Sequence, residues 1–317
     1  MTTKHFSVLV TGELNVDLLL NRIDSFPEIG KETLAGSMTL ALGSSSAIFA
    51  SNLSSLSTKV AFVGKVGADL FGDFVIQSLQ KKNVITEFII RDTQLNTGAT
   101  VVLNFGEERA MVTHTGSMEH LTISDISDDM LLRSEHLHFS SAFLQTGIKN
   151  DLALLFKRAK DSGLTTSFDT QWDPEEQWDL PLDKILPYVD VFLPNKAEAM
   201  FLTRTNSVED ALTQLGKAGN IIVIKLDKEG SLSYHSGDKL FVPSFLNTNV
   251  VDTIGAGDSF NAGFIHKFIQ LKTVAECQTF ANLTGAVSTT AAGGTSAFTD
   301  LHSIMKIAQD KFAFTGD

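Results

Sequence analysis

The sequence is poor in cysteine, in basic residues and in long apolar runs, and each shortage excludes a class of protein. Its single cysteine, Cys277, rules out an intrachain disulfide and is typical of a reducing compartment. Lys and Arg number 25 against 37 Asp and Glu, which gives a net charge of −12. A protein that follows nucleic-acid phosphates needs a stripe of basic residues, and none runs along this chain, so we expect no nucleic acid as a partner.

No apolar run approaches the roughly 18 residues that a membrane span needs, so we expect no membrane partner. The N-terminus lacks the long apolar core of a signal peptide, and these features together predict a cytoplasmic protein. What the sequence does contain is material for a large core, since 43% of its 317 residues are hydrophobic and 20% are charged. This length suits one large α/β domain or two domains of ordinary size.

Strand-like and helix-like segments alternate along most of the chain. Apolar runs of strand length are expected at 6–11, 60–63, 137–139, 165–168, 189–193 and 221–226. Helical patterns are expected after Asn195 and at 44–56, 69–81, 150–161, 207–218, 258–271 and 273–291. This alternation predicts a mostly parallel sheet with helices on both faces, and residues 232–242 add a hairpin.

Two β-rich segments, at about 14–40 and 97–115, do not fit this alternation. The first suggests short, partly exposed strands within 26–42, and in the second, strands at 98–104 and 109–113 flank a turn at 105–108. We interpret both segments as a small appended sheet that closes over the larger unit as a lid. The predicted fold class is α/β, a three-layer α/β/α domain over residues 1–317 with a mostly parallel sheet and a small β-sheet lid.

The run Asp-Thr-Ile-Gly-Ala-Gly-Asp-Ser-Phe at 252–260 carries the strongest chemical signal. Gly255 and Gly257 allow a tight turn with bare backbone N–H groups, and the helix that follows directs its positive end at that turn. Together they predict an anion site. Asp258 stands beside this site, where a carboxylate can accept a proton from a hydroxyl that attacks phosphorus. On spacing alone, a glycine-rich turn with an N-capping aspartate explains the run equally well.

This run, continued by Asn-Ala-Gly-Phe, resembles the C-terminal signature of the ribokinase-like (PfkB) family of carbohydrate kinases. Further matches extend the resemblance over essentially the whole chain. Asn195 and Glu198 after a strand are similar to the family's magnesium and phosphate motif, and Asn15 with Asp17 resembles its first strand and turn. The latter part of the family's N-terminal signature is matched by Gly64, Gly67, Asp69 and Gly72.

The resemblance implies an ATP-dependent kinase that phosphorylates a primary hydroxyl of a small sugar or sugar-like substrate. Asp258 would be the general base. Charge on the transferred phosphoryl group would be stabilised by the N–H groups of Gly255, Ala256 and Gly257. Mg²⁺ would be positioned by Glu198 and Asn195. The residues that would bind the sugar are Asn15, Asp17, Gly43, Ser46 and Arg109. Those that would lie along the nucleotide are Asn195, Lys225, Asp227, Gly230, Thr253 and Asn282.

Two further expectations concern a cation and the assembly. The family resemblance leaves room for a monovalent cation near Asp252 and Gly294. We also expect a homodimer that pairs two lids, because the lid leaves an open sheet edge and carries the apolar run Val101, Val102 and Leu103.

The chain departs from the family pattern at two places. The family usually has Gly-Gly-x-x-x-Asn before the helix that opens near residue 44. We align Leu42 with the first glycine and Ala47 with the asparagine, which is normally a ligand of a sugar hydroxyl. One sugar contact is then missing, so we expect a substrate other than ribose. The common Leu-Gly-x-x-Gly near the nucleotide has Asp227 at its first glycine, which alters one backbone position.

Competing interpretations remain for single residues and for the whole chain. Asn195 with Glu198 also forms an ordinary helix start, and Asp17 suits a solvated turn. A P-loop kinase is excluded because no Gly-Lys-Ser/Thr sequence ends a suitable run, and the signal for a dinucleotide-binding motif is weak. A nucleoside kinase of the same fold and a catalytically silent sugar-binding regulator stay open, because a fold does not fix a function.

Overall fold

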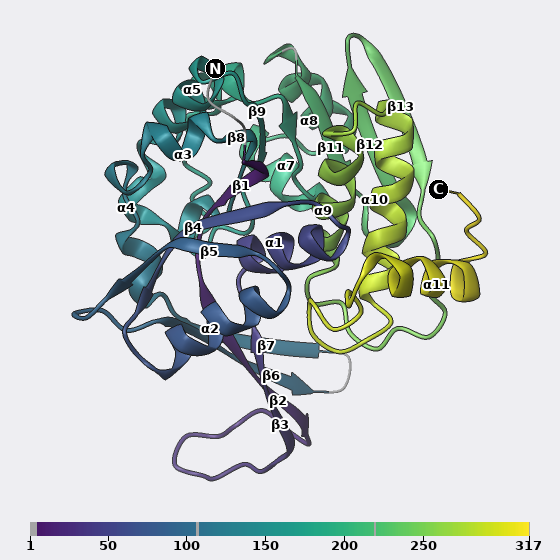
Figure 1. Cartoon of the computed structure of the whole chain (residues 1–317). Helices are drawn as coiled ribbons and strands as arrows, with labels where there is room; N and C mark the ends of the chain where they lie inside the picture. Colours follow the sequence, from purple (N-terminus) through teal and green to yellow (C-terminus); the bar gives the residue numbers. More distant parts are fainter. Residues whose placement is uncertain (1–4, 106–107, 219, 317) are drawn as a thin grey trace.

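A nine-stranded sheet forms the centre of the molecule, with strand order β13-β12-β11-β10-β9-β8-β1-β4-β5 (Figure 1). The computed structural model describes residues 5–105, 108–218 and 220–316. Neighbouring strands pair in parallel from β5 to β11, whereas β12 and β13 add an antiparallel hairpin at one edge. The strand bounds are β1 Phe6–Thr11, β4 Val60–Gly67, β5 Ile85–Asp92, β8 Ser134–Ser140, β9 Thr165–Asp169, β10 Val191–Phe192, β11 Ile221–Lys225, β12 Gly230–His235 and β13 Asp238–Pro243.

Helices lie on both faces of this sheet. Their bounds are α1 Ser45–Ser55, α2 Leu70–Lys81, α3 Asp128–Leu132, α4 Thr146–Lys149, α5 Leu152–Asp161, α6 Leu182–Ile185, α7 Lys196–Thr203, α8 Val208–Leu215, α9 Ala256–Phe268, α10 Val274–Ser288 and α11 Leu301–Phe312. None of the helices within the described residues is long and apolar enough to cross a bilayer.

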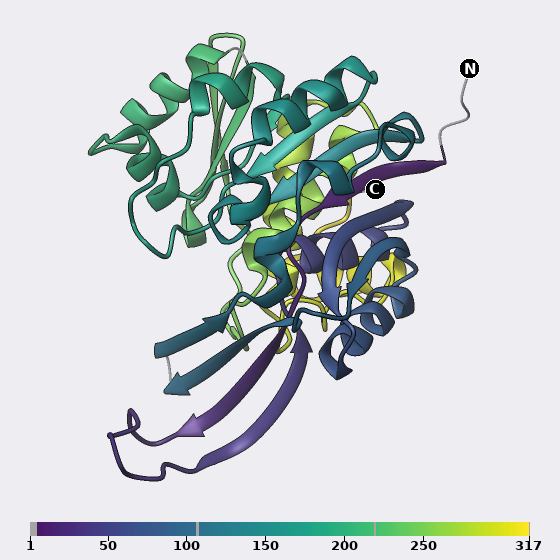
Figure 2. The same ribbon diagram turned by 90° about the vertical axis from the view of Figure 1, so that its left-hand side faces the viewer.

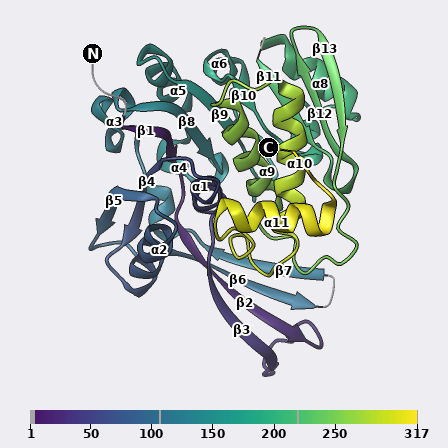
Figure 3. The same ribbon diagram turned by 45° about the vertical axis from the view of Figure 1, so that its right-hand side comes forward.

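The two helical layers follow from the alternation of side chains along buried strands. In β1, Leu9 packs in the cluster that contains Phe156 of α5. Its neighbour Val8 points to the opposite face and packs in the cluster that contains Phe49 of α1 and Phe264 of α9. Figures 1 and 3 show α9 and α10 side by side over this second face. The predicted three-layer α/β/α arrangement is therefore confirmed.

A separate four-stranded sheet, with order β3-β2-β6-β7, projects from one end of this body (Figure 2). Its strands are β2 Asn15–Ile23, β3 Ala35–Leu42, β6 Gly98–Phe105 and β7 Glu108–His114. The two outer pairs are antiparallel, whereas β2 and β6 pair in parallel. The small sheet expected from the sequence is present. Strand structure in the first segment was expected from residue 26, but β3 begins only at Ala35, and part of the predicted turn, 106–107, lies outside the described residues.

The sequence analysis missed the short helices α3, α4 and α6 and two longer elements, β5 and α11. Strand β5 lies at the free edge of the large sheet, where Glu87 and Arg91 interrupt its apolar pattern. Helix α11 packs Ile304 and Ala308 against α10, in a small cluster apart from the two main ones. Strand β5 and helix α11 lie at the periphery, where partial exposure weakens the apolar pattern that identifies buried strands and helices.

The two faces of the small sheet differ in chemistry. Strand register places Asp17, Thr100 and Thr113 on one face, and Leu18 and Val101 on the other. The apolar run that motivated the predicted homodimer is therefore divided between the faces. Val102 is buried on the Asp17 face, whereas the outer face carries the apolar side chains of Leu18, Leu20, Leu40, Val101, Leu103 and Val112.

Candidate active site

Polar side chains gather at the carboxyl ends of the parallel strands, where β1 continues into the small sheet. Strand β1 lies between β8 and β4, so the direction of chain progression reverses at this point. Open α/β sheets bind ligands in the crevice at such a reversal. Three strands end here in charged residues or lead directly into one: Glu13 follows β1, Asp169 ends β9 and Lys225 ends β11.

The predicted anion loop stands at the N-terminus of α9. Gly255 adopts a φ of 74°, and a Cβ atom added to it would lie 2.5 Å from Gly294 Cα. This position therefore needs glycine both for its conformation and for its close packing. Outside its own helix, a Cβ on Gly257 would meet only the Lys225 Nζ atom, at 3.8 Å. The first turn of α9 thus lies beside the Lys225 ammonium, whose positive charge would favour an anion at the start of this helix.

Asp258 lies in the first turn of α9 and its side chain is buried, with 7% of the residue exposed. Burial and then the negative charge of Asp169 raise the pKa of Asp258 to about 8, although the Lys225 ammonium acts in the opposite direction. Its Oδ1 atom accepts a hydrogen bond of 3.1 Å from Gln171 Nε2. A carboxylate with a pKa near neutrality is suited to take up a proton during a reaction.

Asp169 is the centre of a polar cluster that the sequence analysis missed. Its Oδ2 atom accepts hydrogen bonds from Lys225 Nζ at 2.8 Å, from Gln171 Nε2 at 2.9 Å and from Asn261 Nδ2. Burial lowers the pKa of Lys225, but the carboxylates of Asp169 and Glu198 outweigh it and hold that pKa above its usual value. Lys225 therefore stays a cation. An aspartate at the end of a strand was the one sequence signal for this cluster.

The predicted metal residues Asn195 and Glu198 form a capping box at the start of α7. Glu198 Oε2 accepts the Asn195 backbone N–H at 2.8 Å, and Asn195 Oδ1 accepts the Glu198 N–H at 2.9 Å. Burial and the charge of Asp169 raise the pKa of Glu198 to about 7. Asn195 and Glu198 therefore form an ordinary helix start, and this does not exclude a role in binding a metal. In the part of the chain that the structure describes, no group of three or more His, Cys, Asp and Glu side chains could hold a metal ion.

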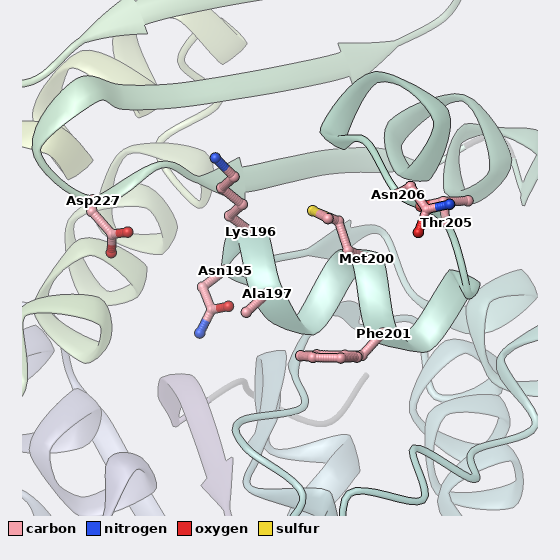
Figure 4. Close-up of a pocket in the computed structure, with 8 residues that line it drawn as sticks. All are labelled: Asn195, Lys196, Ala197, Met200, Phe201, Thr205, Asn206 and Asp227. Carbon is pink, nitrogen blue, oxygen red and sulfur yellow. The ribbon is translucent and has the colours of Figure 1, made fainter.

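A cavity of about 490 Å³ opens beside α7, close to this capping box. Figure 4 shows its lining, in which Asp227 lies on a loop across from Asn195 at the start of the helix. Lys196, Met200 and Phe201 continue the lining along α7. Asn195 and Asp227, two of the residues expected along the nucleotide, thus line the same cavity.

The remaining nucleotide residues have distinct environments. Asp227 adopts a φ of 51°, which explains why glycine is common in the family at this position. Gly230 has a φ of 127°, and a Cβ there would lie 2.1 Å from Val242 O. Thr253 is exposed in the loop before α9. Asn282 was expected along the nucleotide, but its Nδ2 donates to the carbonyls of Val242 and Pro243 and so ties α10 to β13.

On the sugar side, the structure brings together Asn15, Asp17 and Gly43. A Cβ added to Gly43 would lie 2.2 Å from Asp17 Oδ1 and 2.5 Å from Asn15 Oδ1, so this glycine makes room for both side chains. Burial raises the pKa of Asp17 to about 6, although the positive charge of Arg109 opposes the shift. Asn15 donates to Thr100 Oγ1 at 2.9 Å, and its buried Oδ1 has no hydrogen-bond partner among the described residues.

Ser46, by contrast, lies beneath the site and not within it. Its side chain is fully buried, and its hydroxyl is 2.5 Å from Glu13 Oε2 and 2.7 Å from Ser140 Oγ. The prediction that Ser46 contacts sugar therefore needs correction, because these buried partners already occupy the hydroxyl. Sequence reasoning missed Glu13. Its only signal was the position of a carboxylate directly after Gly12, the glycine that follows β1.

The structure also shifts the alignment of the Gly-Gly-x-x-x-Asn pattern by one residue. Ser44 adopts a φ of 71°, a conformation that favours glycine, so it corresponds to the second glycine of the pattern. Gly43 is then the first glycine and Ile48, not Ala47, stands at the asparagine position. Ile48 Cγ2 lies near both Gly255 and Gly294, whereas Ala47 is buried in the core. The position that carries a sugar-binding amide in the family is therefore apolar here.

Comparisons with known proteins show similarity to sugar kinases in sequence and in fold. An uncharacterized sugar kinase from Archaeoglobus fulgidus is 29% identical over 234 residues, which cover 74% of this chain and 92% of the relative. A 5-dehydro-2-deoxygluconokinase from Geobacillus kaustophilus is 26% identical over 281 residues, with coverage of 83% and 82%. A ribokinase homologue from Escherichia coli, solved in complex with ATP and Mg²⁺, has a TM-score of 0.84 at 22% identity, covering 96% of this chain and 100% of the other.

The family model of the pfkB family carbohydrate kinases matches residues 6–300, which include the anion loop, the capping box and the sugar-side residues. Because this match spans nearly the whole sequence, the chain belongs to the PfkB family of carbohydrate kinases.

Proposed function

We propose that this carbohydrate kinase transfers the terminal phosphoryl group of ATP to a primary hydroxyl of a small sugar or sugar-like substrate, with Asp258 as the general base. The observation that carries the proposal is the position of Asp258. Its carboxylate is buried in the first turn of α9, beside backbone that faces Lys225. A base and a phosphate-binding turn are thus adjacent, as in-line transfer to a hydroxyl requires.

The phosphoryl side of the site consists of Lys225 and the start of α9. ATP supplies the phosphoryl group, and the solved relative with ATP and Mg²⁺ supports both as cofactors here. Backbone N–H groups of Gly255, Ala256 and Gly257 would hold phosphate oxygens, although the Ala256 N–H donates to the Thr253 carbonyl at 3.2 Å in this structure. The Lys225 ammonium beside Gly257 would add positive charge. Mg²⁺ would be held by phosphate oxygens and water, with Glu198 reached through water, because both of its oxygens already bond to Asn195.

The sugar side is built by Asp17 and Asn15. When ionised, Asp17 would accept hydrogen bonds from sugar hydroxyls, and Asn15 Oδ1, which has no partner among the described residues, supplies a further buried acceptor. With Ile48 at the asparagine position, one hydroxyl contact is absent. A missing buried contact changes discrimination by about 1–3 kcal/mol, which is enough to change the preferred sugar. We therefore infer that ribose is not the best substrate.

The small sheet acts in this proposal as a lid. Asp17 and Arg109 belong to it, so closing it over bound sugar would complete the sugar contacts and exclude water from the phosphoryl group. Its outer apolar face would pair with the lid of a second copy, which gives a homodimer. The buried free thiol of Cys277 fits the predicted cytoplasmic location.

A substrate panel tests the proposal. Purified protein is assayed with ATP and Mg²⁺ against fructose, 2-keto-3-deoxygluconate, phosphorylated ketoses, ribose and nucleosides. We expect turnover of one sugar or sugar acid above the others. Ribose as the best substrate by a wide margin would refute the specificity argument, and preference for a nucleoside would favour the nucleoside kinase. The absence of ATP turnover with every acceptor would favour a catalytically silent regulator.

A further inference from the structure

The loop that follows β9 brings Gln171 between two carboxylates of the site. Its Nε2 atom donates to Asp258 Oδ1 at 3.1 Å and to Asp169 Oδ2 at 2.9 Å. A primary amide has two N–H donors, so each carboxylate can receive one of them. The two acceptors come from different elements, since Asp169 ends β9 and Asp258 lies in α9. The Gln171 side chain therefore links the sheet to the helix that carries the base.

The backbone of Gln171 is held in an unusual conformation. Its φ is 58°, in the left-handed region that residues other than glycine rarely adopt. The N–H of Gln171 points back to Asp169 Oδ1, at 3.4 Å. Such conformations persist where the surrounding structure fixes them, and they concentrate at functional sites. The hydrogen bonds of its amide show that the Gln171 side chain points toward Asp258, whereas the neighbouring Trp172 is 44% exposed.

The charged groups around Gln171 explain why a neutral hydrogen-bond donor is useful at this place. Asp169 and Asp258 are both buried carboxylates, and the proximity of like charges favours protonation of one of them. Lys225 forms its ion pair with Asp169, at 2.8 Å. Gln171 is a neutral donor that reaches both carboxylates at once. A hydrogen bond to an ionised carboxylate favours the ionised form and fixes its orientation.

We propose that Gln171 is a positioning residue, whose amide orients the Asp258 carboxylate toward the sugar hydroxyl and favours the form of Asp258 that can accept the hydroxyl proton. This inference rests on the proposed function, because it requires Asp258 to be the base. Gln171 itself takes up no proton. Gln171 contributes to kcat, the rate of phosphoryl transfer within the enzyme–substrate complex, and to the pH at which this complex becomes active.

The test compares Gln171→Leu and Gln171→Glu with a matched control, Gln177→Leu. Gln177 is an exposed residue of the same loop, and its Nε2 donates to the carbonyl of Glu175, away from the cluster. For Gln171→Leu we expect kcat to fall about 10- to 100-fold with both KM values nearly unchanged. The acid limb of its pH–kcat profile should move to higher pH. Gln171→Glu, which is nearly isosteric, should lose more activity because it adds a third carboxylate.

The outcomes separate this inference from the proposed function. In an Asp258→Asn background, Gln171→Leu should cause no further loss, because it acts through Asp258. The proposal would be overturned if the pH–kcat profile of Gln171→Leu superimposed on that of Gln177→Leu. A raised sugar KM at constant kcat would also overturn it, because that result indicates a direct contact between Gln171 and the substrate. If Asp258→Asn alone keeps its rate, the proposed function fails before Gln171 is tested. Circular dichroism of each variant shows whether it folds, and loss of structure in both Gln171 variants would make Gln171 a structural residue and contradict the proposal.

Discussion

The Ser46 hydroxyl donates to Glu13 Oε2 at 2.5 Å, and both side chains are buried beneath the predicted sugar site. Gly12 makes this contact possible, because a Cβ at that position would lie 1.9 Å from Ser46 Oγ. Glu13 Oε1 also accepts the Ser46 backbone N–H at 3.2 Å, so one carboxylate anchors the first turn of α1. That turn begins directly after Gly43 and Ser44, and Glu13 therefore fixes the wall of the sugar site.

Glu13 should make the protein less stable as the pH rises from 4.5 to about 7. Burial raises its pKa from 4.5 to about 7. A carboxyl with a raised folded-state pKa contributes stability that is fully present below pH 4.5 and is lost as the pH rises through about 7. We expect Glu13→Gln to remove about 2.5 kcal/mol of this pH dependence, measured by urea unfolding at pH 5 and pH 8. The exposed Glu135→Gln is the control, and equal pH dependence in wild type and Glu13→Gln would contradict the prediction.

Asp258→Asn should fold and bind ATP but turn over about 10²- to 10⁴-fold more slowly, because the amide cannot accept the proton. The wild-type rate should increase as the pH rises through about 8, since the raised pKa of Asp258 leaves it protonated and inactive below that value. Steady-state kinetics across pH and ATP binding by calorimetry measure both effects. A variant that keeps more than about a tenth of the rate would show that Asp258 is not the base.

Glu198→Gln should raise the Mg²⁺ concentration needed for half-maximal activity about tenfold, because outer carboxylates commonly tune metal affinity. The glutamine can still accept the Asn195 N–H, so α7 should keep its start. Glu209→Gln is a suitable control, since Glu209 also stands in the first turn of a helix, α8, but is exposed. Undiminished wild-type activity with excess chelator, or an unchanged Mg²⁺ requirement in the variant, would count against the prediction.

Gly43→Ala should raise the KM for sugar about tenfold while the KM for ATP stays the same. The added methyl group would lie 2.2 Å from Asp17 Oδ1, so the Asp17 carboxylate must move away from its position. Initial rates over a matrix of both substrate concentrations separate the two constants. An unaltered sugar KM would place the sugar away from Asp17.

Val112→Asp should convert the predicted homodimer to a monomer. Val112 is 66% exposed on the outer face of the small sheet, so a charge there costs the monomer little. Met111→Asp is the matched control, because Met111 is 59% exposed on the opposite face. Sedimentation at micromolar concentration measures the state of each variant, and a monomeric wild type would refute the dimer.

The sequence by itself determined the features that depend on neighbouring residues. Alternating apolar runs and helical patterns specified a parallel sheet covered on both faces, because burial of each segment follows from its own periodicity. The anion loop was equally local, since Gly255, Gly257 and Asp258 lie within one turn. The small sheet was recognisable because its segments broke the alternation.

Only the tertiary structure decided which distant polar groups meet. Gln171 and Asp258 are separated by 87 residues, Lys225 and Asp169 by 56, and Glu13 and Ser46 by 33. The conformation of Ser44 likewise placed Ile48 at the asparagine position, one residue beyond the alignment made from sequence. The physical reason is that parallel strands distant in sequence end at the same edge of the sheet, and burial there makes each polar group depend on a partner that no local pattern reveals.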